Sequence, residues 1–288
     1  MSVLSVENLI YGYSKGTPFE KAALNDVTLT FDEGDIVAII GHTGSGKSTL
    51  LQHLNGLLKP DSGDILIDGV SIYSSKEALR QCRFNVGLCF QYPEQQLFES
   101  TVYSDIAFGP TNMKLSQGEI DARVRESLSF VGLSEDYLEK SPFDLSGGEK
   151  RRVAIAGVIS MRPKVLILDE PTAGLDPIGK NNLLNLIKEY NKTTGSTVIF
   201  VSHNMDDVAA VANKVIVMNG GKVAIQGTVD EVYSQGELLS DLGLDVPEIT
   251  AIYLELKKQG YVTGDTAYTV DGAVDSILKT LKEGGTSV

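Results

Sequence analysis

The sequence has few cysteines and fewer basic than acidic residues, and each shortage narrows what the chain can do. Cys82 and Cys89 are its only cysteines. We therefore expect no disulfide framework, and two thiols without clustered histidines make a poor metal site. The 25 Lys and Arg residues stand against 38 Asp and Glu residues, a net charge of −13. A nucleic-acid-binding surface needs clustered basic residues, so we expect no nucleic-acid partner.

Long apolar runs are also missing. No stretch approaches the roughly 18 to 20 apolar residues of a membrane span, and residues 1–7 lack the basic and apolar regions of a signal peptide. We therefore expect a cytoplasmic protein. The 288 residues, 42% of them hydrophobic, allow one large domain with a proper core, or one domain with a smaller appendage.

The most informative stretch is GHTGSGKST, residues 41–49. It follows an apolar run, residues 36–40, and leads into an apolar helical pattern, which is the strand, loop and helix of a phosphate-binding P-loop. The glycines let backbone N–H groups converge, and the helix start adds its own N–H groups and dipole. Lys47 can reach the outer phosphates, and the Ser48 hydroxyl can ligate Mg²⁺. A glycine-rich turn without a ligand is the alternative that the flanking strand and helix disfavour.

The remaining pattern predicts an α/β fold. Residues 3–9 and 26–32 are expected to form strands, and residues 26–32 alternate in polarity, which favours an antiparallel hairpin. Residues 165–168 are continuously apolar, as in a central parallel strand. We expect residues 92–98 to form a loop, because Pro93 blocks helix continuation. The region that follows is helical and polar and resembles an insertion into the core. Two further helices are expected near residues 248–258 and 272–282.

A second acidic motif ends the central strand. Asp169 follows residues 165–168 directly, where a carboxylate would hold Mg²⁺ directly or through water. Glu170 comes next, where a base could polarise an attacking water. The alternative for Asp169 and Glu170 is a solvated acidic turn, which the nearby P-loop motif disfavours.

Ser146 is a good N-cap for the helix that follows the LSGGE segment, residues 145–149.

These motifs together resemble the ATPase subunit of ATP-binding cassette (ABC) proteins. LSGGE upstream of DEPT, with the AGLD loop, Gln91 and His203, carries the resemblance over residues 1 to about 235. It implies a P-loop core with a mostly parallel sheet, an antiparallel β subdomain and a helical subdomain at about residues 92–160. Residues 236–288 would form a C-terminal appendage. Two ATPases would pair head to tail, with each ATP between one P-loop and the partner's LSGGE segment.

The resemblance also implies roles for single residues. Glu170, His203, Gln91 and Lys47 would be catalytic, and Ser48, Gln91 and Asp169 would hold Mg²⁺. The residues expected around ATP are Tyr13, Gly41, His42, Thr43, Gly44, Ser45, Gly46, Lys47, Ser48, Thr49, Gln91, Ser146, Gly148, Glu149 and Asp176. Tyr13 would stack on adenine, with Tyr11 as the alternative. The side chains of His42 and His53 are expected to be incidental. Glu149 stands where the family more often has Gln.

A narrower resemblance is to energy-coupling factor transporters, of the second (A-prime) ATPase type. It rests on FQYPEQQLF at residues 90–98, SPFD at residues 141–144 and LGLDVP at residues 242–247. It implies a second ATPase, with a heterodimer favoured, and a transmembrane coupling subunit bound through residues 92–109. Substrate-binding membrane subunits would be indirect partners, and the chain would lie at the cytoplasmic face of the membrane. We expect Glu94 and Asp105 to meet basic residues of the coupling subunit.

Three other functions use similar motifs. A cobalt- or nickel-type importer would differ only in its partners. A soluble ABC ATPase acting on ribosomes or DNA usually carries two cassettes or a long coiled-coil insertion, and this chain has neither. A non-hydrolysing regulator is disfavoured because Glu170 and His203 are both present.

Overall fold

The computed structural model describes residues 1–262 and 267–282. Its strands are β1 Ser2–Tyr13, β2 Lys21–Asp32, β3 Ile36–Ile40, β4 Ser62–Ile67, β5 Val70–Ser71, β6 Val86–Cys89, β7 Val165–Asp169, β8 Thr197–Val201, β9 Lys214–Asn219 and β10 Lys222–Thr228. Its α-helices are α1 Lys47–Leu54, α2 Lys76–Asn85, α3 Val102–Asn112, α4 Gln117–Phe130, α5 Gly147–Ile159, α6 Pro177–Thr194, α7 Met205–Val211, α8 Val229–Tyr233, α9 Gly236–Asp241, α10 Glu248–Lys258 and α11 Val270–Lys282. Short 3₁₀ helices are η1 Pro93–Gln96, η2 Glu135–Tyr137 and η3 Pro142–Asp144.

The larger sheet has the strand order β10-β9-β3-β8-β7-β6. All neighbours in it are parallel except β10, which pairs antiparallel with β9. Every residue of β3, β7 and β8 is buried, as expected for strands covered on both faces. The predicted mostly parallel core is confirmed.

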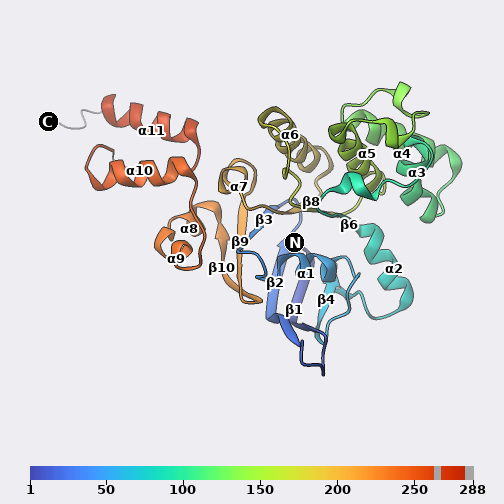
Figure 1. Cartoon of the computed structure of the whole chain (residues 1–288), viewed down its shortest axis with the longest axis horizontal. Helices are drawn as coiled ribbons and strands as arrows, with labels where there is room; N and C mark the ends of the chain where they lie inside the picture. Colours follow the sequence, from blue (N-terminus) through green and yellow to red (C-terminus); the bar gives the residue numbers. More distant parts are fainter. Residues whose placement is uncertain (263–266, 283–288) are drawn as a thin grey trace.

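The smaller sheet has the order β2-β1-β4-β5 and is antiparallel throughout. Its apolar face and one face of the larger sheet enclose α1, so Leu50 and Leu54 pack in one core with Leu29 of β2 and Ile39 of β3. Figure 1 shows α1 between the two sheets. The helix that follows the P-loop is therefore fixed on both sides.

The other face of the larger sheet is covered by helices. Alternate residues of β3, Ile36, Ala38 and Ile40, point into this second core, which includes side chains from α3 to α8. Helices α3, α4 and α5 form a lobe at one side of the molecule (Figure 1). Ser116 caps the start of α4, with Glu119 closing a capping box.

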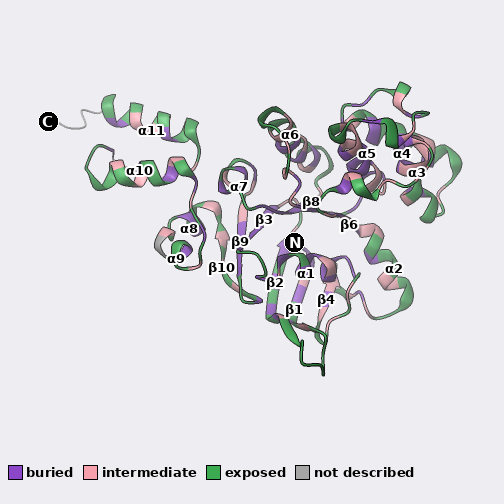
Figure 2. Ribbon diagram, viewed as in Figure 1, coloured by how far each residue is buried: buried purple, intermediate pink, exposed green. Residues whose placement is uncertain are grey.

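Helices α10 and α11 form an arm at the opposite end from the lobe (Figure 1). They have a small core of their own around Tyr253, Val262, Ala267 and Ala273. Most of their remaining surface is exposed, as Figure 2 shows. Both helices lie where the sequence predicted them.

Two local predictions differ from the structure. Residues 93–96 form a 3₁₀ helix instead of a loop, and Pro93 starts it. Proline is tolerated there because the first helical residue needs no N–H donor. Helices α8 and α9 were not predicted, because neither is longer than six residues and neither repeats an apolar period.

Candidate functional site

The P-loop is packed so closely that glycine is required at two positions. At Gly41 a Cβ atom would lie 2.3 Å from the Met218 carbonyl oxygen, and at Gly46 it would lie 2.6 Å from that of Ala23. Both residues also have positive φ, 151° and 107°. The loop is therefore pressed between β9 and β2, and its shape is fixed before any ligand arrives.

The loop has the groups that a phosphate needs. Gly46 at the N-cap of α1 offers no side-chain cap to the first-turn N–H groups, so these groups are suited to an anion. Lys47 is buried, and its Nζ donates to the carbonyl oxygens of Gly41 and His42 at 2.6 and 3.0 Å. Burial lowers the pKa of Lys47, whereas the charges of Glu170 and Asp169 raise it. The buried Ser45 Oγ has no partner within the described residues.

Asp169 ends β7 beside the start of α1. Burial raises the pKa of Asp169 above its ordinary value, while a hydrogen bond with Ser48 and the charge of Lys47 act to lower it. Within residues 1–262 and 267–282, no group of three or more His, Cys, Asp or Glu side chains could hold a metal by itself. Ser48, Asp169 and Gln91 are oxygen donors, which fits a Mg²⁺ ion that also takes phosphate oxygens and water.

Three predicted catalytic side chains meet at the carboxyl ends of three adjacent strands. The Gln91 Nε2 atom donates to Oε2 of Glu170 at 3.1 Å. The His203 Nε2 atom lies 2.8 Å from Oε1 of the same carboxylate. These residues follow β6, β7 and β8, which are neighbours in the sheet, so parallel pairing brings them together. Glu170 is thus held from both sides.

Tyr13 lies against the P-loop helix. Its hydroxyl is 3.1 Å from Oγ1 of Thr49, and its ring meets that of Tyr11 edge-on, with centroids 5.0 Å apart. Tyr11 in turn meets His53 at 4.6 Å, and the buried His53 ring bonds the Thr49 carbonyl oxygen at 2.8 Å. His53, expected to be incidental, therefore belongs to a closed ring of contacts under Tyr13. The His42 ring bonds the Asn219 side chain, on the β9 side of the loop.

The LSGGE segment lies elsewhere on the chain. Ser146 caps α5 and donates its hydroxyl to Glu149 at 2.6 Å, while Tyr137 donates to the same carboxylate at 2.6 Å. These hydrogen bonds lower the pKa of Glu149 to about 2, so the carboxylate is charged. Ser146, Gly148, Glu149 and Asp176 line one cavity of about 570 Å³, to which residues 41–49 contribute nothing. One chain therefore separates two parts of the predicted ATP site.

Two acidic residues of segment 92–109 have partners within the chain. Glu94 forms a bidentate pair with Arg151, both distances being 3.1 Å. Asp105 accepts hydrogen bonds from the backbone N–H groups of Phe98 and Glu99. Both carboxylates thus have partners within the chain, while their contact with basic residues of a coupling subunit stays a prediction. The sequence offered no signal for Arg151, because its partner is distant along the chain.

Comparison with known proteins agrees with this geometry. The family model described as ABC transporter matches residues 24–173. The energy-coupling factor transporter ATP-binding protein EcfA2 of Caldanaerobacter subterraneus subsp. tengcongensis is 52% identical over 279 residues, covering 97% of this chain and 98% of that protein. The EcfA2 protein of Clostridium perfringens is 51% identical over 280 residues, with coverage of 97% and 98%.

Two solved structures have the same fold. The protein cbiO1 from Clostridium perfringens, described as part of the ABC transporter complex cbiONQ, has a TM-score of 0.73 and 44% identity and covers 84% of this chain and 94% of its own. A dimeric ATP-binding cassette in a post-hydrolysis state with ADP and Pi has a TM-score of 0.70 and 29% identity, with coverage of 78% and 98%.

The chain therefore belongs to the ABC transporter family of ATP-binding proteins. Within that family, about half of its residues are identical to those of energy-coupling factor ATP-binding proteins over nearly the full length, which places it among them. Both levels of the resemblance seen in the sequence are confirmed. In the described part of the chain, no helix is long and apolar enough to cross a membrane.

The packing of the P-loop predicts that Gly46→Ala weakens ATP binding by about tenfold or more. The new methyl group would meet the Ala23 carbonyl oxygen, and the left-handed backbone would add strain of about 1–2 kcal/mol. ATP titration by calorimetry measures the effect. The control is Gly118→Ala on α4, because a Cβ atom there would have nothing within 4 Å. Equal ATP affinity in Gly46→Ala and the unsubstituted chain would contradict the packing argument.

Proposed function

We propose that this chain hydrolyses ATP to power an energy-coupling factor transporter, with Glu170 as the general base. The observation that carries the proposal is the Glu170 carboxylate, which Gln91 and His203 hold at 3.1 and 2.8 Å. A carboxylate fixed at the mouth of a P-loop can accept the proton of an attacking water. Near-full-length similarity to transporter ATP-binding proteins supports the transport role.

Each neighbour of Glu170 has a separate task in this proposal. Gln91 and His203 orient the carboxylate and the water, and His203 also faces the position of the γ-phosphate. Lys47 and the first-turn N–H groups of α1 bind the phosphates, and Tyr13 provides an aromatic face for adenine. Ser48, Asp169 and Gln91 would hold Mg²⁺, which offsets the charge of the phosphate oxygens when bound.

This proposal predicts that Glu170→Gln lowers kcat for ATP by about 100-fold or more, while ATP still binds. The amide keeps the size of the side chain but cannot take a proton. Turnover by the assembled transporter and ATP titration measure the two effects, with the exposed Glu139→Gln as the control. Full turnover in Glu170→Gln would remove Glu170 from the role of base.

The second half of the site is proposed to come from another ATPase. Ser146, Gly148 and Asp176 line a cavity apart from the P-loop, and α5 begins beside them with its positive end. In a head-to-tail pair these groups would face the partner's γ-phosphate, and we favour a heterodimer. The dimeric cassette among the solved relatives supports such pairing.

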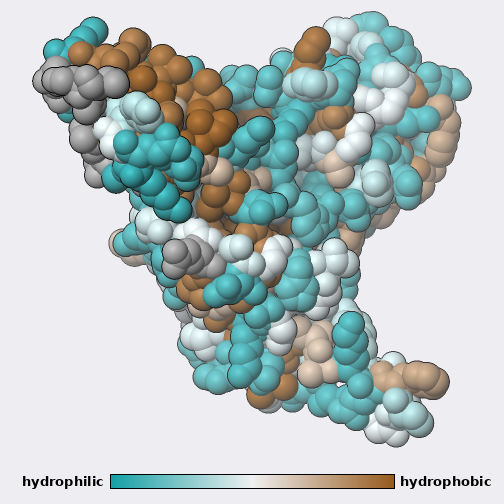
Figure 3. Space-filling model, turned by 60° about the vertical axis from the view of Figure 1, so that its left-hand side comes forward, coloured by the Kyte–Doolittle hydropathy of each residue, from teal (hydrophilic) through white to brown (hydrophobic). Residues whose placement is uncertain are grey.

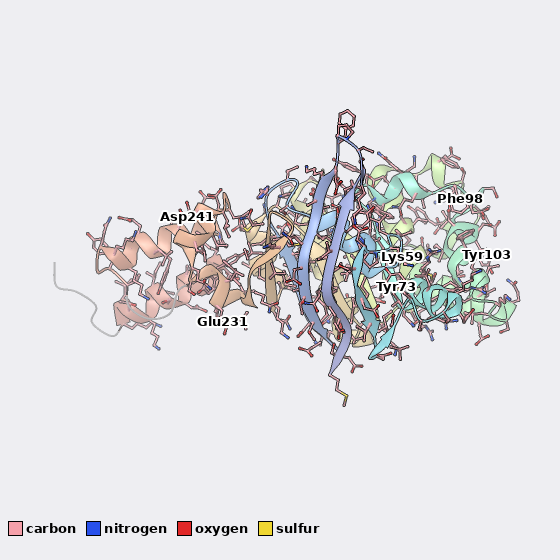
Figure 4. The ribbon with its side chains drawn as sticks, turned by 90° about the horizontal axis from the view of Figure 1, so that it is seen from below. Lys59, Tyr73, Phe98, Tyr103, Glu231 and Asp241 are labelled. Atoms are coloured by element: carbon pink, nitrogen blue, oxygen red, sulfur yellow. The ribbon has the colours of Figure 1, made fainter. Side chains whose placement is uncertain are left out.

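The membrane partner is proposed to bind the groove beside residues 92–109. Phe98 and Phe108 lie edge-on, with ring centroids 5.0 Å apart, and are 57% and 48% exposed. They line a cavity of about 250 Å³ together with Phe84 and Met161. Figure 4 shows Phe98 at the surface of the lobe. Exposed aromatic pairs of this kind mark interaction surfaces.

A transmembrane coupling subunit seated in this groove would hold the chain at the cytoplasmic face of the membrane. The substrate-binding subunits would then be reached only through the coupling subunit.

Replacing both aromatic residues should therefore impair assembly. Phe98→Ser with Phe108→Ser is expected to reduce co-purification with the membrane partner while the ATP affinity of the chain stays unchanged. The control is Phe19→Ser, an 83% exposed phenylalanine in the β1–β2 loop. The groove proposal fails if the double variant assembles as well as the control.

Residues 236–288 are proposed to be a separate appendage to residues 1–235 that adds to contact between the two ATPases. Helix α11 exposes Val270, Val274, Leu278 and Leu281, which recur along one side. Figure 3 shows apolar side chains gathered on this arm. This exposed apolar stripe of α11 suits contact with the matching arm of a second ATPase.

The stripe predicts that Val274→Ser with Leu278→Ser weakens association of the ATPase pair by about tenfold or more, because apolar area is lost from the contact. Sedimentation of the two ATPases measures the dissociation constant. Lys279→Ser, on the same helix, changes an exposed residue without removing apolar stripe surface and should associate normally. Unchanged association of the double variant would exclude α11 from the contact.

A second candidate is the ATPase of a cobalt- or nickel-type importer. The solved relative cbiO1, part of the cbiONQ complex, has the same fold and is 44% identical. The ATP site would be identical in both cases, so only the partners separate them. Purification of the complex from its native membrane and identification of its subunits decide between the two.

A further inference from the structure

The turn that follows Glu170 is held in an unusual conformation. Glu170 has a φ of +49°, in the left-handed region that non-glycine residues avoid. Its N–H donates to the Val201 carbonyl oxygen, and its own carbonyl accepts from the Ala173 N–H, both at 3.1 Å. Such a backbone persists when its surroundings fix it. The contacts of residues 171–173 therefore bear directly on where the Glu170 carboxylate lies.

Arg151 of α5 holds this turn from the helical lobe. Its Nη1 donates to the carbonyl oxygens of Pro171 and Ala173, at 3.0 and 2.9 Å. Its side chain is only 7% exposed. Both ends of the three-residue turn are thus bonded to one planar guanidinium group, whose geometry is rigid.

The other side of the guanidinium is bonded to η1. Its Nε and Nη2 atoms each donate to one Glu94 oxygen at 3.1 Å. Burial alone would raise the pKa of Glu94, but the hydrogen bonds and charge of Arg151 outweigh it, and this pKa lies below its ordinary value. The paired charges make a buried arginine tolerable. Glu94 lies in the short helix that precedes Phe98, beside the proposed membrane groove.

The middle of the turn is bonded from the opposite direction. The Thr172 hydroxyl donates to Oδ2 of Asp207 at 2.9 Å, and Lys180 lies 2.5 Å from the other oxygen. Asp207 is 2% exposed and belongs to α7, the helix after His203. All three residues of the turn therefore have a partner outside it.

We propose that Arg151 is a positioning residue for ATP hydrolysis, which fixes the turn after Glu170 relative to the 93–96 segment beside the membrane groove. It acts through Pro171 and Ala173, whose carbonyl oxygens accept its hydrogen bonds. A displacement of η1 by the membrane partner would reach Glu170 through Glu94 and Arg151. The inference rests on the proposed function, because it assumes that Glu170 is the base.

The test measures kcat and KM for ATP in the assembled transporter carrying Arg151→Met, Arg151→Lys or Glu94→Gln. A small displacement of a catalytic group can cost about tenfold to 100-fold in rate, so we expect kcat to fall about tenfold or more in both Arg151 variants. KM should stay within about twofold, because the phosphate-binding groups are untouched. Lysine should not rescue, since it keeps the charge but lacks the fork. Glu94→Gln should lower kcat less, because an amide oxygen still accepts one bond.

The matched control is an arginine–glutamate pair in the same lobe. Arg162 pairs with Glu126, and both side chains are more than half exposed. Arg162→Met and Glu126→Gln should leave kcat and KM unchanged. A second pair of variants leaves the buried charges of Arg151 and Glu94 in place. Thr172→Val removes the hydroxyl bond to Asp207 and should lower kcat, whereas Thr172→Ser keeps the hydroxyl and should retain the original kcat.

The inference is overturned if Arg151→Lys and Arg151→Met keep the original kcat per folded molecule, or if the control pair lowers kcat equally. It is also overturned if only KM rises, or if Thr172→Val matches Thr172→Ser. Failure of the proposed function is distinct, because the unsubstituted transporter would then show no ATP turnover, or turnover that Glu170→Gln does not reduce.

Discussion

The positive ends of two helices, α1 and α5, lie in different parts of the chain, and this separation governs how the protein can work. Helix α1 starts at Lys47 between the two sheets, while α5 starts at Gly147 in the helical lobe (Figure 1). The first-turn N–H groups of α1 have no side-chain cap and suit an anion, whereas Ser146 and Glu149 cap the start of α5. In the proposed pairing, one triphosphate would lie between α1 of one ATPase and α5 of the other. The free energy of ATP binding would then stabilise the closed pair of ATPases.

Closure can lead to hydrolysis only if the general base is already in place. Glu170 is held by Gln91 and His203, and its turn is bonded to Arg151. The same arginine reaches Glu94 beside the proposed membrane groove. The buried Arg151 side chain therefore connects the turn after Glu170 to the helical lobe. The lobe in turn carries the surface where a membrane partner would bind.

Local patterns in the sequence predicted much of the fold and the main motifs. Strand β7 and the P-loop follow from an apolar run and a glycine spacing, which are short-range features. The roles of Arg151 and His53 could not be read in this way, since the partners of Arg151 are far along the chain and His53 depends on the stacking of Tyr11. The pairing of Glu94 with Arg151 was missed for the same reason, because a carboxylate in a polar segment gives no sign of a buried arginine.

In the proposed pairing, one chain carries half of an ATP site. ATP turnover per mole of this chain should be measured against the concentration of the second ATPase subunit, below and above the dissociation constant of the pair. A divided ATP site predicts turnover near zero without the partner, rising with the fraction of paired chains and then levelling off. Turnover by the single chain that stays constant as the partner is added would contradict it.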